Sequence, residues 1–182
     1  MGKLIAKTYG DALYELAMEE NKIDLFSQEV AALSAVMKEN EDLTKLINHP
    51  KVIKEEKIQV MKNIFQGKIS DELLGFVEII IQKDRFPEFQ PILDYFIRSV
   101  KEYKKIGTAY VATAVELSKN QKKEVENRLL ETTSYVQMEM EYSVDKSLIG
   151  GMVIRIGDRV VDTSIKNKLN ELSKELYNIQ LA

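Results

Sequence analysis

The chain has 182 residues, with 26 lysine and arginine residues against 29 aspartate and glutamate residues, a net charge of −3, and no cysteine. The nearly balanced charge counts against a protein that neutralises many nucleic-acid phosphates, and the lack of cysteine excludes disulfides, thiolate nucleophiles and cysteine-based metal sites. No apolar run approaches the roughly 18 residues that a membrane-spanning helix needs, so we expect no direct insertion into a bilayer.

The first 105 residues show helical periodicity throughout. Apolar residues recur at steps of three and four from Lys3 onward, and again between Phe26 and Met37, as in amphipathic helices that pack on their neighbours. A third, short helix should end before Pro50, because the residue before a proline avoids helical geometry. A fourth should end at Gly67, since glycine is a common helix stop.

The fifth predicted helix, Asp71–Gln82, is apolar on nearly every side, and Ser70 is its expected N-cap. A surface helix normally has one apolar stripe and one polar face, so something must cover the second face. Two interpretations stay open: burial on all sides by neighbouring helices, or an outer face that forms, with the first helix, a groove for an amphipathic helix of another protein. After Pro87 and Pro91, a last helix over 92–105 completes an expected six-helix bundle.

From residue 106 onward the pattern changes to mixed strands and helices. Strands are predicted in TAYVATAVEL and YVQMEMEYSV because apolar and polar residues alternate there. Between them, Ser118 and Gln121 match a capping box at the start of a helix. The segment GMVIRIGDRVVD predicts a hairpin that turns at Gly157 and Asp158, residues suited to tight turns. An amphipathic helix from Ile165 ends the chain.

This change of pattern predicts two domains and an α+β fold class. Residues 1–105 should form the helical bundle, and residues 106–182 a small mixed α/β domain. Neither region has a strong excess of one charge.

No residue pattern builds a catalytic or cofactor site. His49, the only histidine, stands before Pro50 at a predicted helix end, as expected of a surface or capping residue. The glycines near residues 150 and 157 lack the lysine and hydroxyl residues of phosphate-binding loops. Adjacent acidic residues diverge by about 100° around a helix and cannot face each other as an acid–base pair. We therefore expect no catalytic residue, no cofactor and no metal site.

Three segments resemble one protein family, and the resemblance covers essentially the whole chain. The segment DKSLIGGMVIRIGDRVVDTSIKNKLNEL, with Asp145, the Gly150–Gly151 pair and VDTS before the last helix, strongly resembles the C-terminal signature of the delta subunit of bacterial F-type ATP synthases. The mitochondrial counterpart is the oligomycin-sensitivity-conferring protein. The opening AKTYGDALYELA and the middle LINHPKVIKEEK are also similar to that family.

The resemblance implies a non-catalytic stator subunit that links the catalytic head of the ATP synthase to its peripheral stalk, so that rotary torque is coupled to ATP synthesis or hydrolysis. In this family the helical domain receives N-terminal segments of the head's alpha subunits, and the C-terminal domain meets the C-terminal ends of the stalk's b subunits. The resemblance also implies one copy per complex, no bound nucleic acid, and a place on the cytoplasmic face of the bacterial plasma membrane through the complex.

The resemblance also suggests which residues touch these partners. Because the family's head-binding groove lies between the first and fifth helices, it should include Tyr9, Ala12, Leu16, Phe76, Ile79 and Ile80. The signature or contact residues on the stalk side are expected to be Gly150, Gly151, Arg155, Gly157, Asp158 and Asp162.

A second class of function stays open from the residues alone. Small helical bundles with an α/β appendage can serve as RNA-binding or transcription-antitermination modules, and fold alone does not decide between functions. The lack of a dense lysine and arginine face counts against this alternative.

Overall fold

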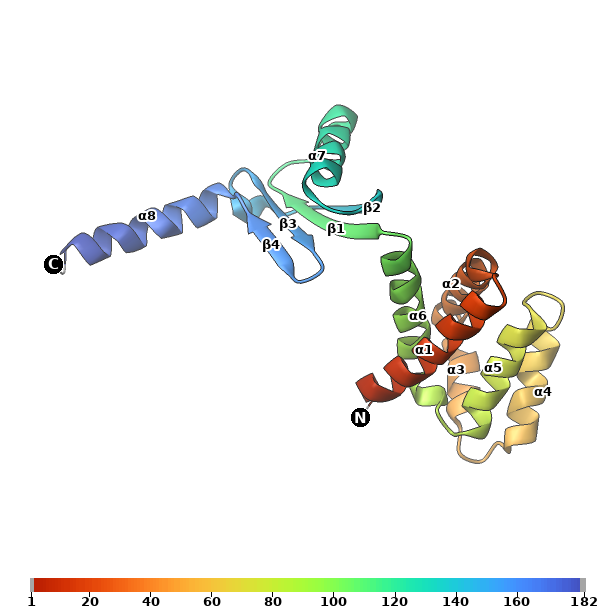
Figure 1. Cartoon of the computed structure of the whole chain (residues 1–182). Helices are drawn as coiled ribbons and strands as arrows, with labels where there is room; N and C mark the ends of the chain where they lie inside the picture. Colours follow the sequence, from red (N-terminus) through yellow and green to blue (C-terminus); the bar gives the residue numbers. More distant parts are fainter. Residues whose placement is uncertain (1, 181–182) are drawn as a thin grey trace. The chain divides into compact units, whose positions relative to one another are not determined.

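The computed structural model describes residues 2–180 of the chain, with side chains described as far as Lys174 (Figure 1). The chain divides into two compact units, of which the first ends at Lys101 and the second begins at Glu102, close to the change of pattern at residue 106. Helices and a mixed four-stranded sheet make this an α+β protein.

The first unit consists of helices around one hydrophobic core. In chain order they are α1 (Gly2–Glu19), α2 (Ile23–Glu39), α3 (Glu41–Asn48), α4 (Lys54–Phe65), α5 (Asp71–Gln82), the short 3₁₀ helix η1 (Phe86–Glu88) and α6 (Phe89–Tyr103). The largest fully buried side chains include Phe26, Phe89 and Phe96. Because α6 begins at Phe89 and not after Pro91, the proline lies in the first helical turn, where its missing N–H is not needed.

Helix α5 is buried on nearly all sides, which answers most of the question that its sequence raises. Leu73, Val77 and Ile80 have no exposed surface. Among the apolar side chains of α5, Ile79 is the exception, with 48% of its surface exposed. Burial by neighbouring helices therefore accounts for most of α5, and Ile79 is the apolar side chain of this helix that stays exposed.

Neighbouring helices hold α5 through polar contacts. Glu29 of α2 accepts hydrogen bonds from the backbone N–H of Ser70 at 3.0 Å and from its hydroxyl at 2.6 Å. Ser70 occupies the predicted N-cap position, but its hydroxyl binds Glu29 and does not cap the helix. On another side of α5, Glu78 pairs with Lys62 of α4 at 3.0 Å. The register of α5 is thus set by α2 and α4 together.

The second unit is built on a sheet with the strand order β2-β1-β3-β4. Strand β1 (Ile106–Thr113) runs parallel to β2 (Gln137–Val144), and the helix α7 (Lys119–Thr132) connects them, as a parallel pair requires. Strands β3 (Met152–Ile156) and β4 (Arg159–Asp162) form the predicted hairpin. The 3₁₀ turn η2 (Lys146–Leu148) precedes β3, and α8 (Ile165–Gln180) follows β4. The capping box of Ser118 and Gln121 at the start of α7 is confirmed.

Helix α7 packs on one face of this sheet. Ala109 and Val111 of β1 are buried on that face. Tyr142, the register partner of Val111, donates a hydrogen bond to the Lys122 carbonyl of α7 at 3.0 Å. On the opposite face, Tyr110 is exposed. Around β1 the sheet therefore has one buried and one open face, as the alternating sequence predicts, whereas β4 is exposed throughout.

Candidate functional site

One flank of α1 carries a strip of apolar residues away from α6. On the α6 side, Asp11 accepts a hydrogen bond from the Tyr95 hydroxyl at 2.9 Å, and Gly10 lies directly against the Tyr95 ring. The strip on the other flank has steps of four, three and four residues, which place its members on one side of the helix. It comprises Ile5, Tyr9 and Leu16, which are half-buried, and Ala12, which is exposed.

A matching strip lies on the flank of α5 that turns away from α4. Because Glu78 faces Lys62 of α4, residues 72, 76 and 79 occupy the other flank at steps of four and three. Glu72 at the start of this strip binds Lys22, just after α1, at 2.6 Å between Lys22 Nζ and Glu72 Oε1. The beginning of α5 is thereby joined to the end of α1, and the two strips belong to one surface.

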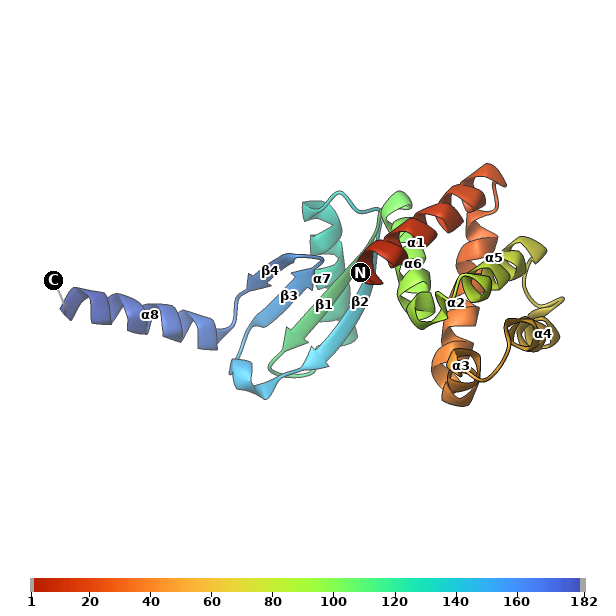
Figure 2. The ribbon, with the colours of Figure 1, turned by 90° about the horizontal axis from the view of Figure 1, so that it is seen from below.

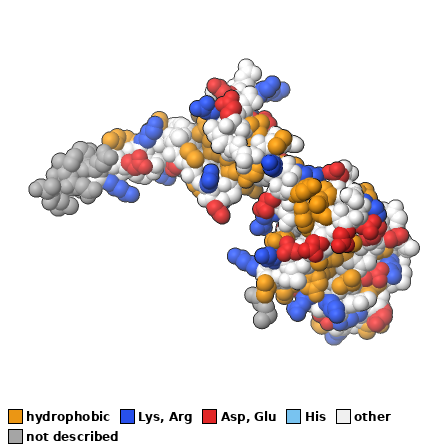
Figure 3. Space-filling model, viewed as in Figure 1, with side chains coloured by type: hydrophobic (Ala, Val, Ile, Leu, Met, Phe, Trp, Pro, Cys, Tyr) orange, Lys and Arg blue, Asp and Glu red, His pale blue; other side chains and the backbone are white. Residues whose placement is uncertain are grey.

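We call this region the α1–α5 surface and define it by Ile5, Tyr9, Ala12, Leu16, Phe76 and Ile79. Figure 1 shows α1 and α5 in front of the fainter α2 and α3, and Figure 3, from the same side, shows hydrophobic side chains gathered there beside a row of acidic side chains. Ile79 and Ala12 are its exposed members.

The structure places the six residues expected in the head-binding groove at different depths. Tyr9, Ala12, Leu16 and Ile79 reach the surface, whereas Phe76 is only 8% exposed. Ile80 has no exposed surface and belongs to the core, because its position on α5 points between the neighbouring helices. Sequence reasoning left out Ile5, although its spacing from Tyr9 places it on the same strip.

At the end of the α1–α5 surface near Lys22, the electrostatics come from two ion pairs that share this lysine. The hydrogen bond with Glu72 raises the pKa of Lys22 above its ordinary value, and the same bond lowers the pKa of the Glu72 carboxyl. Glu20 also lies 3.5 Å from Lys22 Nζ. Both partners therefore keep their charges near neutral pH, and this end of the surface remains polar.

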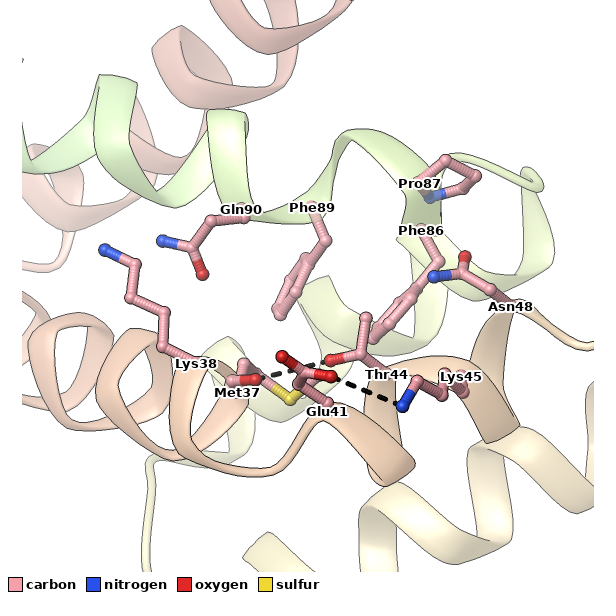
Figure 4. Close-up of a pocket in the computed structure, with 10 residues that line it drawn as sticks. All are labelled: Met37, Lys38, Glu41, Thr44, Lys45, Asn48, Phe86, Pro87, Phe89 and Gln90. Carbon is pink, nitrogen blue, oxygen red and sulfur yellow. Dashed lines mark hydrogen bonds and ion pairs between the residues drawn. The ribbon is translucent and has the colours of Figure 1, made fainter.

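A pocket of about 390 Å³ opens elsewhere on the first unit, between α2, α3 and the start of α6 (Figure 4). Its apolar wall includes Met37 and the stacked rings of Phe86 and Phe89, whose centroids are 4.9 Å apart. At the mouth, Lys45 pairs with Glu41 at 3.3 Å, so the charges there are already satisfied. The Thr44 hydroxyl in its lining donates to the Met37 carbonyl at 3.3 Å and not to a base, so it is not activated as a nucleophile.

In the second unit, the signature glycines pack against the connection into α8. A side chain on Gly150 would meet the Ile165 Cδ1 atom at 2.6 Å, and one on Gly151 would collide with the Thr163 carbonyl. Gly151 also has a φ of +74°, a conformation that favours glycine. The Ile165 N–H donates to the Gly150 carbonyl at 3.0 Å. These two glycines thus allow the chain entering α8 to cross closely over the turn before β3.

Two carboxylates complete the same junction. Asp162 accepts a hydrogen bond from the Ser164 N–H at 2.8 Å, and Asp145 accepts one from the Ser147 N–H at 2.9 Å. These bonds, with a smaller contribution from Lys166, lower the pKa of both carboxyls below the ordinary aspartate value. We call this set, Asp145, Gly150, Gly151 and Asp162–Ser164, the α8 junction. Its contacts serve to fix where α8 begins.

The other three expected stalk-side residues lie outside this junction. The Arg155 guanidinium stands over the Tyr110 ring on the open face of the sheet, 4.8 Å from the ring centroid. Gly157, with a φ of +56°, and the exposed Asp158 form the turn between β3 and β4. The six residues are therefore split among the junction, the sheet face and the hairpin tip.

Within residues 2–174, no group of three or more His, Asp or Glu side chains is placed to hold a metal ion. Across residues 2–180, no helix combines the length and the apolar character required to cross a membrane.

Comparisons with known proteins agree on one family. The family described as ATP synthase delta (OSCP) subunit matches residues 5–176. An ATP synthase subunit delta from Lachnoclostridium phytofermentans is 52% identical over 181 residues, covering 100% of both chains. Another, from Desulforamulus reducens, is 34% identical and covers 96% of both. Among solved structures, a chain of the Toxoplasma gondii mitochondrial ATP synthase hexamer shares the fold, with a TM-score of 0.72, 18% identity, and coverage of 94% of this chain and 97% of that one.

These relationships support the stator function over the RNA-binding alternative. The subunits of this family have no active site, and they act within a membrane-associated ATP synthase by linking its parts. The chain therefore belongs to the ATP synthase delta (OSCP) family and is a non-catalytic stator subunit that links the catalytic head of the enzyme to its peripheral stalk.

Proposed function

We propose that the first unit, as a six-helix bundle, binds the N-terminal segment of an alpha subunit of the head on the α1–α5 surface. The observation that carries this proposal is the 48% exposure of Ile79 on a helix whose other apolar side chains are buried. Apolar residues three and four apart on two helices suit an amphipathic helix that lies along them. A helix of the alpha subunit would then supply the missing cover for α5.

Apolar contact suits the mechanical task of a stator subunit. The subunit must keep the head from turning with the rotor, and it performs no chemical step. Burying the exposed half of the Ile79 side chain would contribute about 1 kcal/mol, and its neighbours on the surface would add to this. A contact centre that is sealed from water dissociates slowly, which is the property needed under sustained torque.

Replacing Ile79 by aspartate tests the head-binding role. We expect Ile79→Asp to weaken binding to ATP synthase heads lacking this subunit by at least about tenfold, because a charge would be buried in the contact. Ile53→Asp is the matched control, since Ile53 is 57% exposed and lies outside the α1–α5 surface. Unfolding of Ile79→Asp, followed by circular dichroism, would show instead that Ile79 serves the core, and equal binding of both variants would reject the surface.

The second unit is then the part that meets the C-terminal ends of the b subunits. The α8 junction and the exposed residues of α8 both belong to this unit. That core cluster runs from Ala6 to Val100, so the first unit has a core of its own. Deleting residues 106–182 should therefore abolish binding to the b subunits and preserve binding to the head. If the fragment folds but binds neither the b subunits nor the head, the result would argue against two separate binding sites.

We place this single copy on the cytoplasmic face of the bacterial plasma membrane, held there through the complex. A tagged chain should recover alpha and beta subunits with ATPase activity from gently solubilised membranes. Sealed vesicles of known orientation should expose the tag to protease only when the cytoplasmic side faces outward. Cleavage in the opposite orientation would contradict this location.

A further inference from the structure

The turn between η2 and β3 contains one residue in a strained backbone conformation. Ile149 has a φ of +67° and a ψ of −42°. A positive φ is an outlier for a β-branched residue, because the Cβ atom and its two branches crowd the backbone, and this ψ lies outside even the left-handed helical region. Such strain persists only where the surrounding structure enforces it. Neighbouring contacts must therefore hold Ile149 in this conformation.

The side chain of Ile149 does not offset this strain by packing, because it is 64% exposed. The residues on either side of it are held instead. Leu148 is only 7% exposed, and its N–H donates to the Asp145 carbonyl at 3.2 Å. On the other side, the Gly150 carbonyl accepts the hydrogen bond from the Ile165 N–H at the start of α8. Ile149 thus has to join a buried residue to a residue that is bound to α8.

The bond between Ile165 and Gly150 is the part of this arrangement that can open without disturbing the sheet. Strand β4 stays joined to β3 when it opens, because the Thr163 N–H donates to the Met152 carbonyl at 2.9 Å. In Figures 1 and 2, α8 extends away from the sheet beyond this point. Leu169 of α8 is already 53% exposed, so release of the helix would uncover little additional apolar surface.

We propose that this turn is a strained latch for α8. In the docked state Ile149 keeps its positive φ and Gly150 binds Ile165, and in the released state Ile149 relaxes to a negative φ and the bond opens. The strain raises the free energy of the docked state and so increases the population of the released state. The latch is a property of this chain alone and does not rest on the proposed stalk-binding role. A released α8 can change its direction, and any protein that binds the second unit would then favour one direction.

Hydrogen exchange of the Ile165 amide in the full-length chain tests the latch, because this amide is protected only in the docked state. The amide of Val111, a buried residue of β1, reports unfolding of the whole unit. In the wild type we expect the protection factor at Ile165 to be at least about tenfold lower than at Val111. Ile149→Gly should raise protection at Ile165 about three- to tenfold, because glycine adopts this conformation without strain.

Two control variants separate backbone strain from other effects. Ile149→Ala retains a Cβ atom and most of the strain, so protection at Ile165 should stay within about twofold of the wild type. Val144→Gly introduces the same glycine flexibility at another exposed β-branched residue, which lies at the end of β2 in ordinary extended backbone. This variant should lower protection at Ile165, because glycine there relieves no strain and only adds freedom to the released chain.

Three results would overturn the latch. Equal protection of the Ile165 and Val111 amides in the wild type would show that α8 does not separate from the sheet. An unchanged or lower protection factor in Ile149→Gly would show that the turn holds no strain that release removes. A gain in Ile149→Ala as large as in Ile149→Gly would assign the effect to the isoleucine side chain and not to the backbone. None of these measurements involves the b subunits, so each result leaves the stalk-binding role to its own test.

Discussion

Lys22 and Glu72, fifty positions apart in the sequence, form an ion pair of 2.6 Å that joins the end of α1 to the beginning of α5. The pair lies at one end of the α1–α5 surface, where it sets the two helices against each other. Because α1 and α5 carry the two halves of the proposed head-binding surface, the geometry of that surface depends on a contact that no local sequence pattern reveals.

The contribution of the Lys22–Glu72 ion pair to the stability of the fold should depend on pH, and the variant Glu72→Gln tests this. The folded-state pKa of Glu72 is lowered, so its stabilising effect is present above the unfolded pKa and disappears as the pH falls through the folded value. Urea unfolding of the wild type and Glu72→Gln should therefore differ near pH 7 and converge below the ordinary glutamate pKa of 4.5. A difference that persisted unchanged at low pH would show that the carboxylate charge is not its cause.

Glu29 accepts two hydrogen bonds from Ser70, and together they should contribute more to the free energy of unfolding than the bond from the Ser70 hydroxyl alone. Glu29→Ala removes the acceptor for both the backbone N–H and the hydroxyl of Ser70, and should lower the free energy of unfolding by about 1–2 kcal/mol. Ser70→Ala leaves the N–H bond in place and should lower it by only about 0.5–1 kcal/mol. Denaturant unfolding of both variants checks the order, and a larger loss for Ser70→Ala would mean that the hydroxyl has the main role.

A comparison of Gly151→Ala with Gly157→Ala should distinguish the loss of stability caused by backbone strain alone from the loss caused by strain and steric collision together. Both glycines have positive φ, but an added side chain at Gly151 would collide with the Thr163 carbonyl, whereas Gly157 has open space around it. Gly157→Ala should destabilise the unit by about 1 kcal/mol, and Gly151→Ala by about 2–3 kcal/mol. Hydrogen exchange at the Ile165 amide should accelerate only in Gly151→Ala. Equal exchange in the two variants would contradict the role of Gly151 in the α8 junction.

Gly10→Ala and Gly75→Ala should change stability in opposite directions, although both glycines are helical. An added methyl group at Gly10 would collide with the Tyr95 ring. The Tyr95 hydroxyl donates a hydrogen bond to Asp11, which keeps the ring in this position. The resulting overpacking should reduce stability by about 1–2 kcal/mol. Nothing lies within 4 Å of the position of a side chain on Gly75, so alanine there should add about 0.5–1 kcal/mol through helix propensity. Thermal unfolding measures both, and stabilisation by Gly10→Ala would show that Tyr95 moves freely.

Several features of the fold could be predicted from the sequence because they depend on neighbours along the chain. The periodicity of three and four residues indicated α1 to α5, the alternating pattern indicated β1 and β2, and the capping box marked the start of α7. The sixth helix begins earlier than expected, since Pro91 is tolerated in a first turn. Val136, expected in the second strand, lies just before β2 and is 74% exposed.

The sequence by itself thus determined the α+β class, the apolar character of α5 and the amphipathic character of α8, because periodicity and burial preference are local properties. Tertiary structure alone decided that Ile80 lies in the core while Ile79 is exposed, since that depends on which helices pack on each side of α5. It also decided that Ser70 binds Glu29 and that Gly150 and Gly151 adjoin α8. These contacts join residues distant in sequence, and only the packing of whole elements brings them together.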